Sequence, residues 1–200
     1  MDIEIRKLTP DLAEDYARFF DTTPHNAEGD GIKCYCVIMR SDDSYAGDGD
    51  HWFPTQEERR ERAIGFVRAG SLQGYLACRG DKIVGWCNAT ADCQLGVNHL
   101  RSYYPIEEYR ADVKVKSIFC FVIAPEVQRM GVATKLVERV CQDAAADGFD
   151  FIEAYPNKEY AVYNHTGPLA MYETCGFRIR AEREGRVVVR KALKHTKELK

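Results

Sequence analysis

Apolar positions recur along this chain with two different periods. Where they repeat at helical spacing the pattern predicts helices, and where they form short runs rich in β-branched and aromatic residues it predicts strands. The expected helices lie at 10–20, 56–70, 132–148 and 168–175. The expected strands lie at 3–8, 72–78, 83–89, 113–124, 149–155, 177–181 and 187–193. This order predicts a single α/β (α+β) domain over residues 1–200, with a mixed, mostly antiparallel sheet of about seven strands flanked by helices.

Local signals mark the ends of several helices. Thr9-Pro10 is typical of an N-cap followed by a first helical residue, and Thr55-Gln56-Glu57-Glu58 has the spacing of a capping box. Gly148 and Gly176 follow the last periodic residues of two later helices, where a glycine commonly ends a helix. These signals predict where the helices begin and end more firmly than the periodicity does.

Residues 21–54 follow neither period. They include an acidic, glycine-bearing stretch at 42–50, and the pattern predicts loops with one short helix around residues 35–39. Because long loops inside a compact domain often carry function, we expect this segment to cover a binding pocket. Residues 92–112 are polar and are also predicted to be irregular.

The composition is that of a globular chain, with 45% apolar and 30% charged residues. The formal net charge is −3, which divides into −6 over residues 1–100 and +3 over residues 101–200. No dense basic stripe is present, so we expect no nucleic-acid partner. The longest apolar run, at 118–124, is too short to cross a bilayer, and no signal-peptide pattern is visible. We therefore expect a cytoplasmic protein with no membrane partner.

The eight cysteines fit reduced thiols of such a compartment better than a disulfide framework. Cys34 and Cys36 form the only close pair, and their C-x-C spacing differs from the C-x-x-C of zinc knuckles. Packed, inert thiols are the interpretation that we favour, with no metal site. A metal-binding regulatory domain that uses Cys34, Cys36 and His51 is the alternative.

The most informative segment covers residues 121–136. A strand leads through a proline-bearing turn into an amphipathic helix, and Gly131 and Ala133 at the junction leave room for a ligand to approach the backbone. The first N–H groups of a helix have no partner within it, and the helix dipole adds positive charge there, so the junction predicts an anion site. The segment is neither a P-loop nor a Rossmann fingerprint. A plain connection between a strand and a helix is the alternative.

The stretch Gln128-Arg129-Met130-Gly131-Val132-Ala133 resembles the [RQ]-x-x-G-x-[GA] acetyl-CoA signature of the GNAT N-acetyltransferase superfamily. Farther along, Met171-Tyr172-Glu173-Thr174-Cys175-Gly176-Phe177 resembles the Y-x-x-x-G-F block of the same family. The resemblance implies an N-acetyltransferase with acetyl-CoA as its co-substrate and a primary amine as its acceptor, working by direct attack in a ternary complex. The acidic first half of the chain favours a cationic acceptor, and we expect a small molecule.

The resemblance also implies roles for individual residues. The backbone of the strand before the signature would pair with the pantetheine arm, and the backbone N–H groups of the signature turn would hold the pyrophosphate. Tyr172 takes the position of the tyrosine that protonates the departing thiolate, with local packing as the alternative. The implied cofactor-binding residues are Phe121, Val122, Ile123, Gln128, Arg129, Met130, Gly131, Val132, Ala133 and Thr134.

An amine acceptor has to lose a proton before it attacks, which requires a base. Glu153 lies inside the apolar strand at 149–155 and is the best candidate, because burial raises the pKa of a carboxyl group. A structural acid held in a salt bridge is the alternative interpretation of Glu153.

Members of the family often have N-x-x-A-x-x-x-Y before the late tyrosine, and here His165 replaces the asparagine and Pro168 the alanine. This departure, together with the lack of a carboxylate within 118–124, supports an alternative function, a catalytically silent GNAT-fold module that binds or senses acyl-CoA. The last hairpin leaves an exposed edge strand, which makes a homodimer a further expectation.

Overall fold

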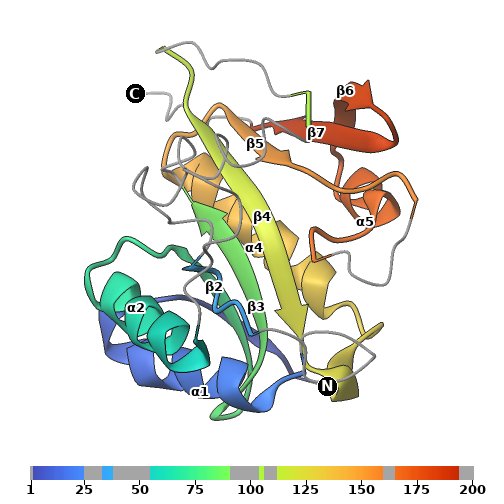
Figure 1. Cartoon of the computed structure of the whole chain (residues 1–200). Helices are drawn as coiled ribbons and strands as arrows, with labels where there is room; N and C mark the ends of the chain where they lie inside the picture. Colours follow the sequence, from blue (N-terminus) through green and yellow to red (C-terminus); the bar gives the residue numbers. More distant parts are fainter. Residues whose placement is uncertain are drawn as a thin grey trace.

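The structure is a computed structural model that describes residues 2–24, 33–37, 55–90, 104–105, 112–159 and 165–193. Within these ranges seven strands form one sheet in the order β1-β2-β3-β4-β5-β7-β6 (Figure 1). Neighbouring strands are antiparallel, except for the parallel pair β4 and β5. The predicted fold class and the mostly antiparallel sheet are confirmed. The strands are β1 (Glu4–Lys7), β2 (Gly74–Arg79), β3 (Lys82–Thr90), β4 (Val115–Ile123), β5 (Phe151–Ala154), β6 (Arg178–Arg183) and β7 (Arg186–Ala192).

The two predicted N-caps, Thr9 and Thr55, mark the start of a 3-10 turn and of one α-helix, and α1 itself begins at Ala13, three residues later than predicted. Helix α1 follows a 3-10 turn that has Thr9 as its N-cap and Pro10 as its first residue. Helix α2 begins at the capping box, where Thr55 Oγ1 accepts a hydrogen bond from the Glu58 N–H at 3.1 Å. None of the described helices combines the length and the apolar character needed to cross a membrane. The helices are α1 (Ala13–Thr22), α2 (Gln56–Arg68), α4 (Val132–Ala146) and α5 (Leu169–Thr174).

The short helix expected around residues 35–39 is wrong at its first two positions. Tyr35 and Cys36 adopt left-handed backbone angles, with φ of 47° and 54°. A right-handed helix cannot begin through two such residues, so the apolar spacing there reflects burial in a tight turn. The middle position, Val37, does adopt a 3-10 conformation, and the last two positions of the expected helix lie outside the described residues.

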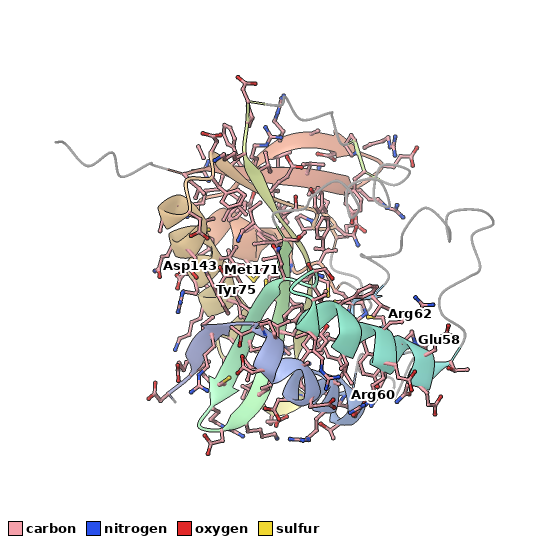
Figure 2. All side chains as sticks on the ribbon, turned by 90° about the vertical axis from the view of Figure 1, so that its left-hand side faces the viewer. Glu58, Arg60, Arg62, Tyr75, Asp143 and Met171 are labelled. Atoms are coloured by element: carbon pink, nitrogen blue, oxygen red, sulfur yellow. The ribbon has the colours of Figure 1, made fainter. Side chains whose placement is uncertain are left out.

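The helices cover the two faces of the sheet. A Cβ added to Gly85 of β3 would lie 3.3 Å from Val132 of α4, which places α4 over that face. The next residue, Trp86, points the other way, and its ring centroid lies 4.9 Å from that of Tyr16 in α1. Figure 2 shows α2 on the side of α1, with Asp143 of α4 across the sheet. We call these the α4 face and the α1 face.

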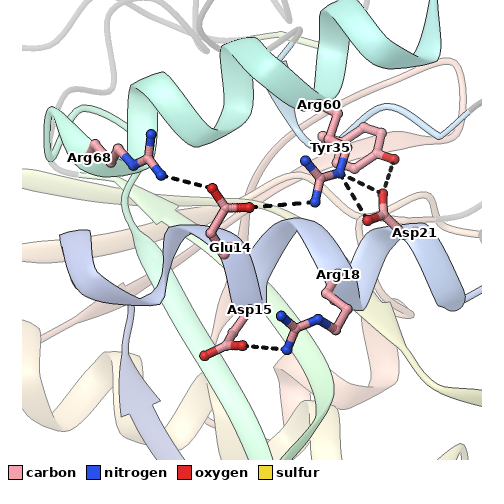
Figure 3. A network of polar contacts seen from close by, with 7 residues as sticks. All are labelled: Glu14, Asp15, Arg18, Asp21, Tyr35, Arg60 and Arg68. Carbon is pink, nitrogen blue, oxygen red and sulfur yellow. Dashed lines mark hydrogen bonds and ion pairs between the residues drawn. The ribbon is translucent and has the colours of Figure 1, made fainter.

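Ion pairs join α1 and α2 along their outer surface (Figure 3). Glu14 of α1 contacts Arg68 at 2.8 Å and Arg60 at 3.6 Å. Asp21, at the other end of α1, contacts Arg60 at 3.0 Å and accepts a hydrogen bond from the Tyr35 hydroxyl at 2.6 Å. The network therefore attaches the segment 33–37 to both helices.

Strand β4 has one extra residue at one point of its pairing with β3. Asn88 of β3 pairs with Cys120, but the next residue of β3, Ala89, pairs with Ile118. Phe119 therefore has no partner in β3 and forms a β-bulge. Because of this extra residue, the order in which the side chains of β4 alternate between the two faces shifts by one residue at the bulge.

The first four residues of β4 pair with all four residues of β5. Their pairing ends at Ile118 and Ala154. Beyond that point β4 continues toward α4, while the chain that follows β5 leads away toward α5 (Figure 1). We call this separation the fork, and it lies next to the bulge.

Candidate functional site

The turn between β4 and α4 leaves the start of the helix open. The chain passes through a 3-10 turn at Pro125–Val127 and enters α4 with Gly131 as its N-cap. No side chain of the described residues caps this end, and residues 128–131 are exposed. The first N–H groups of a 15-residue helix therefore face outward at the positive end of its dipole. This arrangement suits an anionic ligand.

Gly131 keeps the space beside the helix start empty. Its φ is +79°, which glycine adopts without strain, and a Cβ added there would meet nothing within 4 Å. Arg129, two residues earlier, has a left-handed φ of 59° and is exposed. Lys135, one turn into the helix, is exposed as well. A phosphate-bearing ligand could thus reach the backbone with two cations close by.

Alternate residues of β4 turn their backbone groups toward the fork. The Phe121 N–H points there and donates a hydrogen bond to the His165 carbonyl at 2.6 Å. The Ile123 carbonyl lies on the same side and accepts a hydrogen bond from the Gln128 side-chain amide at 3.0 Å. The Ala124 N–H, by contrast, donates to β3. Residues 121 and 123 therefore face the fork, and their neighbours in β4 face β3.

This alternation corrects the expectations for the strand before the signature. Val122 lies two residues before Ala124, whose N–H donates to β3, so the N–H and carbonyl of Val122 also face β3 and not the fork. Phe121 and Ile123 do face the fork, although each already has one group hydrogen-bonded within the chain. The Gln128 side chain ties the turn to β4 rather than extending toward the helix start.

Tyr172 lies on α5 against the same part of β4. It is fully buried, with its ring centroid 6.5 Å from that of Phe121 and 5.2 Å from that of Phe177. Its hydroxyl donates a hydrogen bond to the Thr166 carbonyl at 2.7 Å. Burial raises the pKa of Tyr172 well above its ordinary value, so the hydroxyl keeps its proton at neutral pH.

The segment 165–167 connects the two sides of the fork through its main chain. The His165 carbonyl binds β4 and the Thr166 carbonyl binds α5, whereas the His165 side chain is exposed. A Cβ at Gly167 would lie 2.9 Å from Met171 Cε and 3.4 Å from the Phe121 ring. The backbone thus passes very close to both elements, and the histidine that replaces the family's asparagine contributes its carbonyl.

Glu153 is buried on the α1 face in a network of polar groups. Arg190 of β7 donates from Nε and Nη2 to Glu153 Oε2 at 2.8 and 2.6 Å. The Tyr155 hydroxyl donates to Glu153 Oε1 at 3.0 Å and lies 3.0 Å from Ser117 Oγ. Ser117 pairs with Thr90, which shares the face of Trp86 and places the network on the α1 face. Glu153 is therefore the salt-bridged acid of the alternative interpretation, and two hydroxyls link it to the edge of the fork.

Sequence reasoning identified Glu153 but missed Ser117, Tyr155 and Arg190. Tyr155 could have been found, because residues two apart on a strand share a face. The other two depend on strand register, since Ser117 and Arg190 are the cross-strand partners of Glu153 in β4 and β7. Nothing local in the sequence specifies either register.

The C-x-C pair lies on the α1 face, beneath α1 and α2. The Cys36 N–H donates to Cys34 Sγ at 3.4 Å, and Cys36 Sγ lies 2.9 Å from Cys120 Sγ. Across the part of the chain that is described, no three His, Cys, Asp or Glu side chains gather in a way that could hold a metal ion. His51, the third ligand of the metal interpretation, lies outside the described residues.

Comparison with known proteins agrees with this geometry. Residues 38–177 match the model of the acetyltransferase (GNAT) family, and the chain therefore belongs to the GNAT acetyltransferase family. A search of the curated proteins finds no match.

Several solved structures are similar to this chain. The GNAT domain of PAT from S. lividans has a TM-score of 0.57 and 16% identity, covering 96% of this chain and 90% of that one. A GNAT acetyltransferase from Streptococcus pneumoniae has a TM-score of 0.54 and 19% identity, covering 96% and 100%. The yncA protein from Salmonella typhimurium, a structure that contains acetyl-CoA, has a TM-score of 0.53 and 10% identity, covering 96% and 94%. At these identities the similarity shows the fold.

Proposed function

We propose that this protein transfers an acetyl group from acetyl-CoA to a primary amine of a small molecule, by direct attack in a ternary complex. The observation that carries the proposal is the exposed, uncapped start of α4, which follows β4 directly beyond the fork. Membership of the GNAT family and the acetyl-CoA in the yncA structure support acetyl-CoA as the co-substrate. Bound there, acetyl-CoA supplies an acetyl group on a thioester.

The start of α4 would hold the pyrophosphate. Val132, Ala133 and Thr134 carry the first-turn N–H groups, which have no capping side chain among the described residues. Gly131 leaves the approach open, and Arg129 adds an exposed cation. Backbone donors at a helix N-terminus bind phosphate without regard to the rest of the ligand, so this part of the site would recognise the nucleotide end of acetyl-CoA.

Backbone groups of β4 would orient the pantetheine arm and the thioester. Phe121 and Ile123 turn an N–H and a carbonyl toward the fork. The Phe121 N–H becomes available once the His165 carbonyl moves away from it. A fixed N–H dipole at this position would stabilise the negative charge that develops on the thioester oxygen.

Tyr172 would hold the proton that the departing thiolate takes up. Its hydroxyl is protonated and lies beside Phe121, but it donates to Thr166, so the O–H has to exchange that carbonyl for the sulfur. A thiolate with a pKa near 8–9 leaves readily, so we expect this acid to help the reaction without being required.

Glu153 would take the amine proton through the hydroxyls of Ser117 and Tyr155. Each hydroxyl passes its own proton onward as it accepts the next, so the proton ends at Glu153 Oε1 while Arg190 stays bound to Oε2. This route explains how a carboxylate that is 99% buried could serve a reaction at the fork. In this route Glu153 acts as the base and, at the same time, keeps its ion pair with Arg190.

Calorimetric titration of acetyl-CoA into the wild type, Gly131→Glu and Gly148→Glu tests the donor site. The two glycines have φ of +79° and +75°, both have open space around them, and they lie at opposite ends of α4. We expect micromolar binding to the wild type and to Gly148→Glu, and a loss of at least a hundredfold in Gly131→Glu. Equal binding to both variants would exclude the start of α4 as the pyrophosphate site.

A second assay separates the acetyltransferase from the silent acyl-CoA-binding module. The module is favoured by one observation, namely that the Phe121 N–H and the Tyr172 hydroxyl both have partners within the chain. Release of free CoA from acetyl-CoA is followed with a thiol reagent against a panel of small primary amines. Turnover with any of them supports the transferase. Acetyl-CoA binding without turnover across the panel, and without acetylated products by mass spectrometry, supports the module.

A homodimer through the exposed edge of β6 stays a prediction. Strand β6 is at one end of the sheet, and Ile179 on it is 45% exposed. Sedimentation of the wild type and of Ile179→Lys tests it, because a dimer through this edge would dissociate in the variant.

A further inference from the structure

Two thiols from distant parts of the sequence meet on the α1 face of the sheet. Cys36 Sγ lies 2.9 Å from Cys120 Sγ, and both side chains are buried. The indole N–H of Trp86 donates to Cys36 Sγ at 3.2 Å. The sulfurs are thus closer than two unbonded sulfur atoms usually pack, at a point where β4 passes the bulge.

The segment that carries Cys36 is held by several elements at once. The Tyr35 carbonyl accepts a hydrogen bond from the Tyr16 hydroxyl at 2.9 Å, and the Lys33 carbonyl accepts one from Arg59 Nε at 2.8 Å. The Tyr35 side chain is attached to the network of Figure 3 through Asp21. These contacts keep the backbone in its left-handed turn and direct the Cys36 sulfur toward β4.

Cys120 approaches the Cys36 sulfur from strand β4 of the sheet. It pairs with Asn88, two residues from Trp86 on the same face, and it follows directly after the bulged Phe119. The position of Cys120 is therefore set by hydrogen bonds of the strand, and that of Cys36 by the turn. Two thiols fixed this way lose little conformational freedom on becoming joined, which favours a bond between them.

We propose that Cys36 and Cys120 form a thiol–disulfide site, which a small disulfide such as oxidised glutathione converts into an intramolecular disulfide bond. One thiolate attacks a sulfur of the small disulfide and releases one small thiol. The second protein thiolate then attacks the mixed disulfide and releases the other. The two protein thiols give up two electrons and two protons, and the small disulfide takes them up as two thiols. Bond formation needs the sulfurs to approach by roughly 0.9 Å, to the usual length of about 2.05 Å.

Cys34 provides the entry for the oxidant. It is the half-exposed thiol of the segment, whereas Cys36 and Cys120 are buried. After a mixed disulfide forms on Cys34, Cys36 attacks its glutathione sulfur and releases the Cys34 thiol. Cys120 then attacks the Cys36 sulfur and releases glutathione, which leaves the Cys36–Cys120 bond. We therefore expect Cys34→Ala to slow the reaction while leaving its product unchanged.

The rate of disulfide formation should rise with pH. The hydrogen bond with Cys120, together with burial, raises the pKa of Cys36 well above its ordinary value. For Cys120 the hydrogen bond from Cys36 lowers the pKa, but burial and the neighbouring Cys34 and Cys87 together raise it, and the net pKa is raised. Since the thiolate is the attacking species, cross-linking should become roughly tenfold faster for each pH unit between 7 and 9.

Peptide mapping of the full chain tests the proposal without any assay of acetyl transfer. The protein is incubated with oxidised glutathione, alkylated, and cleaved with trypsin, which separates peptide 34–40 from peptide 117–129. We expect these two peptides joined, with Cys34 alkylated in the fragment spectrum. Cys36→Ala and Cys120→Ala should yield no joined pair, whereas Cys87→Ala, which removes another buried thiol of the same sheet, should behave as the wild type. A Cys34–Cys36 bond, or glutathione on Cys34 with Cys36 and Cys120 both alkylated, would overturn the proposal.

Fluorescence provides a second measurement on the intact fold. In Trp52→Phe protein Trp86 is the only tryptophan, and its indole N–H contacts Cys36 Sγ. A neighbouring disulfide quenches tryptophan, so oxidation should lower the emission severalfold and a reductant should restore it. The same emission before and after oxidation, in protein that mapping shows to be cross-linked elsewhere, would contradict a bond at Cys36.

Discussion

The polar groups around β4 differ between its two sides. On the α4 face they are mainly main-chain N–H and carbonyl groups, whereas on the α1 face they are side chains. The α4 side has the uncapped start of α4 and the carbonyls of His165 and Thr166. The α1 side has the Glu153 network and the thiol pair Cys36–Cys120. The bulge at Phe119 lies between the two, where it changes which residues of β4 face which layer.

The difference fits the two ligands that an acetyltransferase has to distinguish. A common donor can be recognised by backbone N–H groups, because every chain has them and only their placement matters. An acceptor that differs from protein to protein needs side chains, which mutation can change without disturbing the donor site. Five substitutions test this division of roles.

The largest loss of stability should come from a substitution on the α1 face. Glu153→Leu takes the buried carboxylate away from Arg190, whose side chain is 22% exposed, so the loss should lie near the lower end of the roughly 3–5 kcal/mol that removing one partner of a buried ion pair costs. Urea unfolding measures the loss. The double variant Glu153→Leu/Arg190→Met should recover most of it, because two apolar residues replace the pair. If the single and double variants were equally unstable, the ion pair would not be what makes Glu153 important.

On the α4 face, Gly167→Ala should cost about 2 kcal/mol, since the residue has a φ of +82° and its new Cβ would press on Met171 and Phe121. We also expect weaker acetyl-CoA binding, because the shift moves the carbonyls that contact β4 and α5. Gly185→Ala has a φ of +77° with open space and is the control for backbone strain alone. Identical losses in the two variants would show that strain, and not the close packing at the fork, is responsible.

Tyr155→Phe removes the link between Ser117 and Glu153. If the hydroxyls carry the amine proton, kcat at pH 7 should fall about tenfold, which is less than the roughly 10²–10⁴-fold typical of a direct general acid or base, because Tyr155 would only relay the proton. The loss should shrink at high pH, where the amine is already deprotonated, and the KM for acetyl-CoA should stay unchanged. A loss of kcat that is the same at all pH values would argue for a packing role.

Tyr172→Phe is the counterpart of Tyr155→Phe on the α4 face, because it also removes a single buried hydroxyl. It removes the hydrogen bond to the Thr166 carbonyl, which should cost about 1 kcal/mol of stability. Turnover should drop severalfold, with little change in acetyl-CoA affinity measured by calorimetry. An unchanged turnover would remove Tyr172 from the reaction while leaving its structural role.

The smallest loss of stability should come from a substitution on the outer surface of α1. Glu14→Gln breaks contacts with Arg68 and Arg60 between side chains that are half-exposed, and such pairs contribute less than about 0.5 kcal/mol. Asp21→Asn should cost more, because Asp21 also holds the Tyr35 hydroxyl and with it the segment of Cys36. Equal effects in urea unfolding would show that the segment 33–37 does not depend on this network.

The sequence predicted the turn into α4 better than the contacts across the sheet. The helix start after Gly131 follows from a local pattern, namely a strand, a turn and a helix in succession. The error at Val122 arose because a list of consecutive residues ignores that a strand turns alternate backbone groups to opposite sides. The error at Tyr35 and Cys36 arose because apolar spacing does not distinguish a buried tight turn from a short helix.

By itself the sequence determined the order of the elements, the capping of α2, the glycine at the junction before α4 and the resemblance to the family, because each of these depends on neighbouring residues. The tertiary structure alone decided that Glu153 has Arg190 and Tyr155 as partners, that the His165 carbonyl contacts Phe121, and that Cys36 meets Cys120. These contacts join residues far apart in the chain, and they arise from strand register and from a single bulge in β4. Register is set by the packing of the whole sheet, so no local pattern of residues could specify it.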